Sequence, residues 1–168
     1  YTAMLATQQR LIYARVRQMA FLDPVVHMPN LRALSRALNG TSWSTLCFLR
    51  IPELELLGRH YGVLLRIQYK QMLANHLRTL LQPNEAVYHL AGHDLVFRLN
   101  SEGHQARIHL IDRSLRQFRF HWDGVPLQPR IGMSYCNVRS PVKHLYLLLG
   151  ELNTIADMSL ASGHPENL

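Results

Sequence analysis

A short polar segment, A-G-H-D at residues 91–94, interrupts two apolar stretches within YHLAGHDLVFRL, residues 88–99. The apolar residues on both sides, and a glycine that can adopt positive φ, predict a β-hairpin with this segment at its tip. An imidazole and a carboxylate on an exposed turn are groups suited to ligand or metal binding. A zinc site needs further ligands, and apart from His89 none follows with metal-binding spacing. We therefore expect His93 to be exposed at the turn or hydrogen-bonded rather than a zinc ligand.

The elements that would position this turn alternate between helical and strand patterns. Heptad-spaced Leu5, Ile12 and Met19 predict an N-terminal helix, and Pro29 stands near the start of a second helix that stops at Asn39-Gly40. The order α-α-β-α-α-β-β-α-β-β-α favours an α/β (α+β) fold, with helices packed on a mainly antiparallel sheet. The expected helices are 2–22, 30–38, 53–81 (two helices), 102–116 and 141–160, and the expected strands are 44–51, the two arms of the hairpin, 117–124 and 129–138.

Composition favours one folded domain with a basic surface. The 168 residues are 48% hydrophobic and 17% charged, with a net charge of +7, which excludes a disordered chain. The basic residues are scattered, so we expect a solvated surface that faces an anionic membrane or a partner domain, and no DNA. Cys47 and Cys136 lie in apolar runs without metal-binding spacing, which predicts buried, reduced thiols and a cytoplasmic setting. No stretch approaches the 18 consecutive apolar residues that a transmembrane helix requires.

Four motifs along the chain resemble those of the GGDEF family, whose active members make cyclic di-GMP from two GTP molecules. DPVVHMPN from residue 23 resembles D-x-L-T-G-L-P-N, and LCFLRIPELELLGRHYG from residue 46 resembles the strand-loop-helix L-x-L-x-D-x-D-x-F-K-x-x-N-D-x-Y-G. HLAGHDL takes the place of R-L-G-G-D-E-F, and RIGMS resembles S-I-G-V-A. The resemblance implies a nucleotidyl-cyclase-like ferredoxin-type fold. It also implies three parts: a signalling or linker helix (1–22), a degenerate GGDEF domain (23–160) and the start of a linker (161–168).

The resemblance also indicates which residues replace the family's metal ligands. G-G-D-E-F reads Ala91, Gly92, His93, Asp94 and Leu95, so a histidine stands where the family binds metal with an acid. One carboxylate beside a cation is a poor site for a hard divalent ion.

The first strand of the resemblance lacks the family's acids as well. The two aspartates of D-x-D correspond to Arg50 and Pro52, and the loop lysine corresponds to Glu55. A guanidinium would repel Mg²⁺, and proline removes a backbone N–H that could donate to phosphate. We therefore expect no metal and no cofactor in this domain.

The nucleotide-reading positions are changed too. The guanine-binding Asn and Asp correspond to Gly58 and Ile67, which offer no side-chain hydrogen bonds to a base. The product-inhibition motif R-x-x-D corresponds to residues 82–85, with Gln82 in place of the arginine and Glu85 in place of the acid. Nucleotide binding is expected to be weak or absent.

Arg50 and Asp94 should lie close together, because the family brings these two positions to one metal. We expect them to form an ion pair that replaces the metal and holds the hairpin against the first strand; the alternative is that Arg50 points to solvent. A further alternative makes Arg50 a phosphate ligand in a metal-free GTP site.

The resemblance extends to membrane-anchored bacterial GGDEF–EAL phosphodiesterases of cyclic di-GMP. It implies a catalytically inactive regulatory domain that relays a signal from an upstream membrane sensory domain to a downstream EAL domain, on the cytoplasmic side of the inner membrane. Mg²⁺ or Mn²⁺ is then expected only in the EAL domain. The heptad traces of the first helix make a homodimer plausible. The alternatives are a GTP- or cyclic-di-GMP-sensing module, an RNA- or protein-binding adaptor, and an active cyclase.

Overall fold

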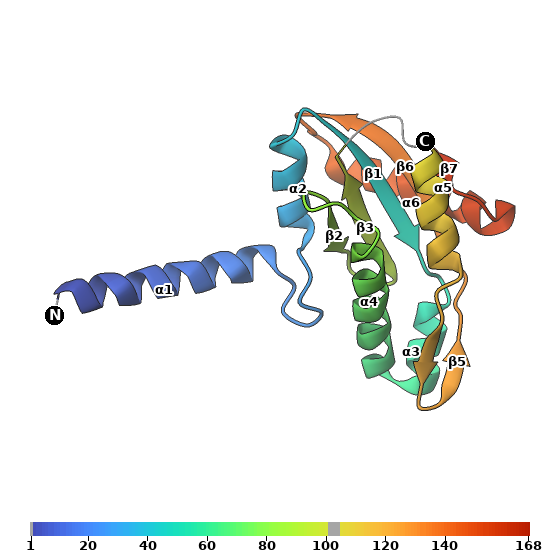
Figure 1. Ribbon diagram of the computed structural model, residues 1–168, viewed down its shortest axis with the longest axis horizontal. Helices are drawn as coiled ribbons and strands as arrows, with labels where there is room; N and C mark the ends of the chain where they lie inside the picture. The colour runs from blue at the N-terminus through green and yellow to red at the C-terminus, as the bar shows by residue number, and fades with distance from the viewer. Residues whose placement is uncertain (1, 101–104) are drawn as a thin grey trace.

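The structure, a computed structural model, describes residues 2–100 and 105–168, with side chains for 3–12, 21–100 and 105–168 (Figure 1). Its helices are α1 (Thr2–Phe21), α2 (Leu31–Asn39), α3 (Leu54–Tyr61), α4 (Val63–Arg78), α5 (Gln105–Arg116) and α6 (Leu145–Ser162). Its strands are β1 (Trp43–Arg50), β2 (Ala86–His89), β3 (Asp94–Leu99), β4 (Phe120–Trp122), β5 (Val125–Leu127), β6 (Gly132–Arg139) and β7 (Glu166–Asn167).

One sheet, in the order β2-β3-β1-β6-β7, forms the centre of the molecule. Its pairs are antiparallel except β6 with β7, so the predicted α+β class is confirmed. β1 is buried on both faces, as the apolar run Leu46–Leu49 at its centre requires. Cys47 and Leu49 face a core shared with α3, α4 and α5, whereas Leu46 and Phe48 face a core shared with α2 and α6.

The hairpin predicted at residues 88–99 is present, formed by β2 and β3. Gly92 at its tip has a φ of +84°, which is the conformation that the glycine was expected to supply. The helical stretch 53–81 divides at Gly62, whose φ of +101° ends α3 and lets α4 start in a new direction. Both free thiols, Cys47 and Cys136, are buried.

Several boundaries differ from the prediction. α6 begins at Leu145 rather than at 141, because the amide of Val142 and the hydroxyl of Ser140 are hydrogen-bonded to Asn39 at the end of α2. The short strands β5 and β7 were not predicted, and β7 lies within the segment expected to start a linker. Residues 102–104 of the helix expected at 102–116 lie outside the described residues.

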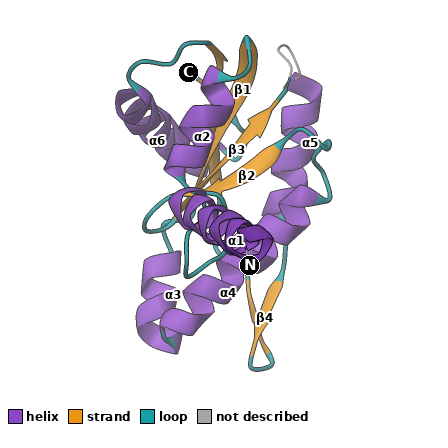
Figure 2. Ribbon diagram, turned by 90° about the vertical axis from the view of Figure 1, so that its left-hand side faces the viewer, coloured by secondary structure: helices purple, strands orange, loops and turns teal. Residues whose placement is uncertain are grey.

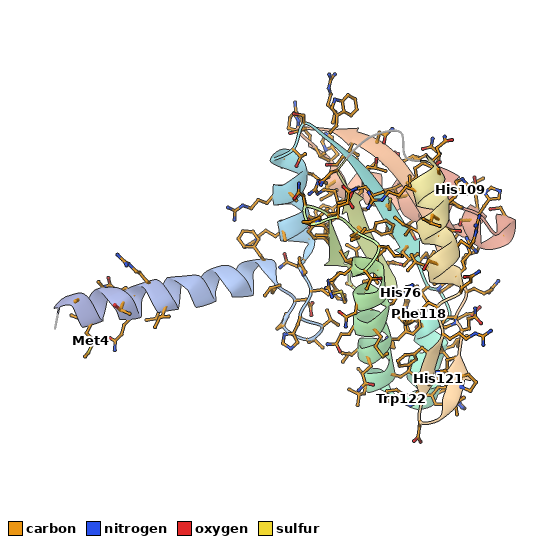
Figure 3. All side chains as sticks on the ribbon, in the orientation of Figure 1. Met4, His76, His109, Phe118, His121 and Trp122 are labelled. Atoms are coloured by element: carbon orange, nitrogen blue, oxygen red, sulfur yellow. The ribbon has the colours of Figure 1, made fainter. Side chains whose placement is uncertain are left out.

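α1 extends away from the sheet as a long arm (Figure 1), and Met4 lies near its free end (Figure 3). Leu5 and Ile12 of the predicted heptad are exposed, and the side chain of Met19 is outside the described ones. Figure 3 also places His121 and Trp122 on the small β4–β5 hairpin at the opposite end from α2. Within residues 2–100 and 105–168, no helix is both long and apolar enough to cross a lipid bilayer.

Candidate functional site

The end of β1 and the start of β3 meet beside the hairpin tip. Arg50 is the register partner of Asp94 on β3 and of Gly132 on β6, so the family's two metal positions are neighbours on the central strands. Cross-strand partners present their side chains to the same face of a sheet. For these two residues it is the face covered by α6, because Phe48 and Val96, two residues further along each strand, contribute to the core shared with that helix.

Arg50 binds α6 and not Asp94, so the expected ion pair between strands is wrong. Its Nη1 donates to Asn153 Oδ1 at 2.7 Å, and its Nε lies 2.6 Å from Asp157 Oδ1. Asn153 and Asp157 are one helical turn apart, and together they offer two oxygens to one guanidinium. The contact ties the last helix to the central strand, and Arg50 does not point freely into solvent.

Asp94 is left as a half-buried carboxylate surrounded by cations. Its Oδ1 is shielded from solvent and has no hydrogen-bond partner among the described residues. Burial raises the pKa of Asp94, although the charges of Arg50, Lys70 and His93 act in the opposite direction. Asp94 therefore interacts with Arg50 through the field of its charge, without direct contact.

His93 connects the hairpin tip to α3. Its Nε2 lies 3.5 Å from Glu55 Oε2, and its backbone carbonyl accepts from the N–H of Ile51 at 3.2 Å. His93 is thus half-buried against an acid of α3 rather than exposed at the turn. Ala91 and Gly92 beside it are exposed.

Two further residues that the resemblance singles out, Leu95 and Glu55, lie near His93. Leu95 on the following strand is buried in the core shared with α3, α4 and α5. Glu55, besides facing His93, accepts from Arg59 at 2.7 Å.

The loop between β1 and α3 has few amides for an anion. Pro52 has no N–H, and the N–H of Leu54 donates to the carbonyl of Ile51 at 3.2 Å. Glu53 adds a negative charge and is paired with Arg130. A phosphate at this loop would meet an acid and lack these two donors.

The two positions expected to read guanine are occupied by other contacts. An added Cβ at Gly58 would lie 2.4 Å from Cδ of Arg66, so the stem of Arg66 lies directly over this glycine. Ile67 is partly buried against the core. The glycine is needed here because the arginine stem occupies the space that a side chain would fill.

A group missed by the sequence reasoning is the buried Lys70 of α4. Its Nζ donates to the carbonyl of Leu90 at 3.0 Å, next to the hairpin tip. Burial lowers the pKa of Lys70 to about 8, against the opposing charges of Asp94 and Asp23. A lysine within a helical pattern is normally predicted to be solvent-exposed, so nothing in the sequence indicated that Lys70 is buried.

Asp23, the first residue of the motif DPVVHMPN, holds the loop that precedes α2. Its Oδ1 accepts from the N–H groups of Val25 and Val26, and its Oδ2 lies 3.3 Å from His89 Nδ1. Burial alone would raise the pKa of Asp23, but these donors and the nearby cations outweigh it and lower the pKa. Burial and Lys70 lower the pKa of His89.

A cavity of about 250 Å³ lies between this loop, α4 and the hairpin tip. It is lined by Asp23, Val25, Val26, Val63, Arg66, Ile67, Lys70, His89 and Gly92.

Glu85 lies at the position that corresponds to the acid of the product-inhibition motif, and here it stabilises the fold. Its side chain is fully buried and paired with Arg107 of α5, whose Nη1 donates at 2.7 Å. The N–H groups of Gln82 and Asn100 also donate to it. Burial alone would raise the pKa of Glu85, but Arg107 and the two N–H donors outweigh it and lower the pKa. Its oxygens are therefore engaged within the protein.

Comparison with solved structures shows what this arrangement is. The coiled coil and GGDEF domain of DgcB from Caulobacter crescentus superposes with a TM-score of 0.81 at 11% identity, covering 99% of this chain and 95% of that one. The GGDEF domain of FimX from Pseudomonas aeruginosa gives a TM-score of 0.70 at 12% identity, covering 88% of this chain and 98% of that one. The chain has the fold of a GGDEF domain. No family model matches the sequence.

Two curated proteins carry a segment similar to this GGDEF fold. The cyclic di-GMP phosphodiesterase PdeF of Escherichia coli K12 is 58% identical over 168 residues, which is 100% of this chain and 22% of PdeF. The probable cyclic di-GMP phosphodiesterase PdeA of the same strain is 31% identical over 145 residues, 86% of this chain and 20% of PdeA. The chain thus spans about a fifth of the length of these relatives.

The side chains at this GGDEF site do not fit a divalent cation. Hard cations need several oxygen ligands, and Asp94 supplies one buried carboxylate beside the guanidinium of Arg50 and the imidazole of His93. Across the described part of the chain, no three His, Cys, Asp or Glu side chains come together in a way that could hold a metal. His93 at the hairpin tip faces Glu55 of α3, and Arg50 at the end of β1 is bound by α6.

Proposed function

We propose that this chain is a catalytically inactive domain of the GGDEF type within a longer cyclic di-GMP phosphodiesterase. In this role it relays a signal from an upstream membrane sensory domain to a downstream EAL domain on the cytoplasmic side of the inner membrane. Mg²⁺ or Mn²⁺ would act only in the EAL domain, and the phosphodiesterase residues would lie outside this chain.

One observation carries the proposal of inactivity: Arg50 stands at the end of β1 and is held there by α6. Active cyclisation requires a divalent cation to neutralise the triphosphate and to activate the attacking hydroxyl. At this position a fixed positive charge, bound by Asn153 and Asp157, occupies the strand end instead. The same contact suits a structural role, because it ties the position of α6 to β1, the central strand of the sheet.

The relation to a phosphodiesterase rests on the similarity to PdeF, which extends over the whole chain at 58% identity. Regulation of a neighbouring domain requires two arrangements that differ in free energy. α1 extends from one side of the fold, while the segment after α6 is pinned to the sheet as β7 (Figure 1). α1 contacts α2, which packs on β2, so a movement of α1 reaches the C-terminal segment through α2 and the sheet.

Calorimetric titration of the chain with GTP tests this proposal. We expect no binding heat at micromolar protein, with or without Mg²⁺, and no cyclic di-GMP product by chromatography. The physical reason is the missing carboxylate set around Arg50 and the arginine stem over Gly58. Mg²⁺-dependent binding would contradict the assignment of the lost acids and the inactivity with it.

The same titration separates inactivity from nucleotide sensing. Metal-independent GTP binding that disappears in Arg50→Ala, and persists in the exposed control Arg59→Ala, would make Arg50 a phosphate ligand. Arg66 and Lys70 at the nearby cavity are cations that would favour such binding. That result would replace the purely structural relay with a GTP-sensing domain.

α1 offers a surface for a second copy of the chain. Met4 and Leu11, like Leu5 and Ile12, are seven residues apart and exposed. An apolar stripe at this spacing is buried when two helices form a coiled coil. We expect Leu5→Glu/Ile12→Glu to convert a dimer to a monomer in analytical ultracentrifugation, whereas Thr7→Glu should leave the dimer intact. A wild-type chain that remains monomeric at roughly 100 µM protein would contradict it.

A further inference from the structure

One end of the molecule is rich in basic residues, and the acid nearest to it in the sequence is the exposed Glu151, one helical turn after Leu147 on α6. Residues 30–44 and 137–150 contain four Arg or Lys and no Asp or Glu, so all 11 acidic residues of the chain lie elsewhere. These segments form α2, the start of β1, the end of β6 and the start of α6. α2 and α6 lie beside each other on one side of the sheet (Figure 2). We name the surface formed by Arg32, Arg36, Arg139, Lys143, Tyr146 and Leu147 the basic face.

Hydrogen bonds between distant segments hold this surface together. The N–H of Ser140 donates to the carbonyl of Ser42, and the N–H of Val142 donates to Asn39 Oδ1 at 3.0 Å. A groove of about 330 Å³ runs between α2 and the start of α6, with Arg32 and Lys143 among its lining residues. The cations are therefore presented from connected elements rather than from separate mobile loops.

Two large apolar side chains project from the same surface. Tyr146 is 79% exposed and Leu147 is 69% exposed, the highest values among large hydrophobic side chains in the part of the chain whose side chains are described. They stand on the first turn of α6, next to Lys143 and His144. Leu145 and Leu149 on the other side of the helix are buried in the core, so this protrusion is not needed for packing.

We propose that the basic face binds the surface of an anionic lipid bilayer. Lys and Arg side chains are attracted to anionic headgroups, and tyrosine and leucine side chains insert at the boundary between headgroups and acyl chains. The groove between Arg32 and Lys143 can receive a headgroup phosphate. The cluster of cations, the groove and the projecting apolar pair together match this occupant.

Other occupants match the surface less well. A second copy would need an acidic patch, whereas Glu53, Glu55 and Glu85 are already paired with basic residues. Single-stranded nucleic acid binds through several aromatic faces along its path, but among the described side chains of this surface Tyr146 alone is a free one, because Arg139 covers the ring of Trp43 at 4.9 Å and Leu147 cannot stack on a base. A peptide would bury its own side chains in a groove, whereas here the largest apolar groups project outward.

Vesicle co-sedimentation tests the proposal on the 168-residue chain, whose sheet is covered on both faces by its own helices. The probes are vesicles of phosphatidylcholine and phosphatidylglycerol at 7:3, on the order of an anionic leaflet, and vesicles of phosphatidylcholine alone. We expect binding to the anionic vesicles only, and weaker binding as salt screens the charges. Each cation near the surface contributes roughly a five-fold increase in partitioning, so Arg32→Glu/Lys143→Glu should weaken binding by at least about twenty-five-fold.

The charge-reversed variant should remain folded, because both positions precede or begin a helix, where an acid is favourable to the helix dipole. The matched control is Arg113→Glu/Arg119→Glu, which makes the same change in charge at exposed positions on the other side of the sheet. Tyr146→Ser/Leu147→Ser should weaken binding roughly ten-fold, and this loss should persist at high salt.

Three results would overturn the proposal. They are no preference for anionic vesicles, an equal loss of binding in the two charge-reversed variants, and binding to single-stranded poly(U) through the basic face without binding to vesicles. Circular dichroism of each variant shows whether the helices are intact.

Discussion

Glu85→Ala is expected to lower the free energy of unfolding by about 4 kcal/mol, because it leaves the charge of Arg107 partly buried and unpaired. The carboxylate accepts from the guanidinium and from the N–H groups of Gln82 and Asn100. It therefore joins three elements: the turn before β2, the end of β3 and α5. Urea unfolding followed by circular dichroism measures the change.

The pH dependence of stability distinguishes this ion pair from simple packing. The pKa of Glu85 in the folded chain lies below its ordinary value of 4.5, so the pair stabilises the fold above that pH. The contribution is lost as the pH falls through the folded pKa. Glu85→Gln, which cannot ionise, should lose this acid-dependent part. The matched control, Glu151→Ala on the exposed side of α6, should change stability by less than about 0.5 kcal/mol. A loss in Glu85→Ala no larger than this control would contradict the pairing.

The sheet was predictable from the sequence where local patterns determine it. β1 has the apolar run Leu46–Leu49 and a proline after its end, and the hairpin has a glycine between two apolar runs. β5 and β7 were not predicted, because three and two residues are too few to show a period. β7 forms only through its pairing with β6, which lies more than 25 residues earlier in the chain.

The partners of the site residues were less predictable than their positions. Arg50 and Asp94 are neighbours in the sheet, as the resemblance implied, but the register of two strands does not fix which way a long side chain turns. Asn153 and Asp157 attract the guanidinium from α6, which follows β1 by about a hundred residues in the chain. The pairing of Glu85 with Arg107 joins residues 22 positions apart and depends on where α5 packs.

Lys70 gives the second large effect: its ionised form destabilises the fold, whereas the ionised form of Glu85 stabilises it. A folded pKa of about 8 against the ordinary value of 10.5 means that the unfolded chain binds more protons in this range, so stability rises with pH. Relative to Lys70→Met, the wild-type chain should gain about 2–3 kcal/mol of unfolding free energy between pH 7 and pH 10. The control is Lys143→Met, at the other lysine of the chain, which is exposed. The unfolding free energy of this variant should change with pH as that of the wild-type chain does.

If the unfolding free energies of wild type and Lys70→Met change with pH in parallel, the Lys70 ammonium is solvated and does not interact electrostatically with Asp94. The expected divergence has a consequence for the site. A buried amine that is largely protonated at neutral pH supplies, with Arg50, positive charge that Asp94 faces. Since these cations belong to the protein, the carboxylate requires no bound metal for its charge to be balanced. Adding Mg²⁺ or EDTA should then leave the unfolding free energy unchanged at every pH at which Lys70 is protonated.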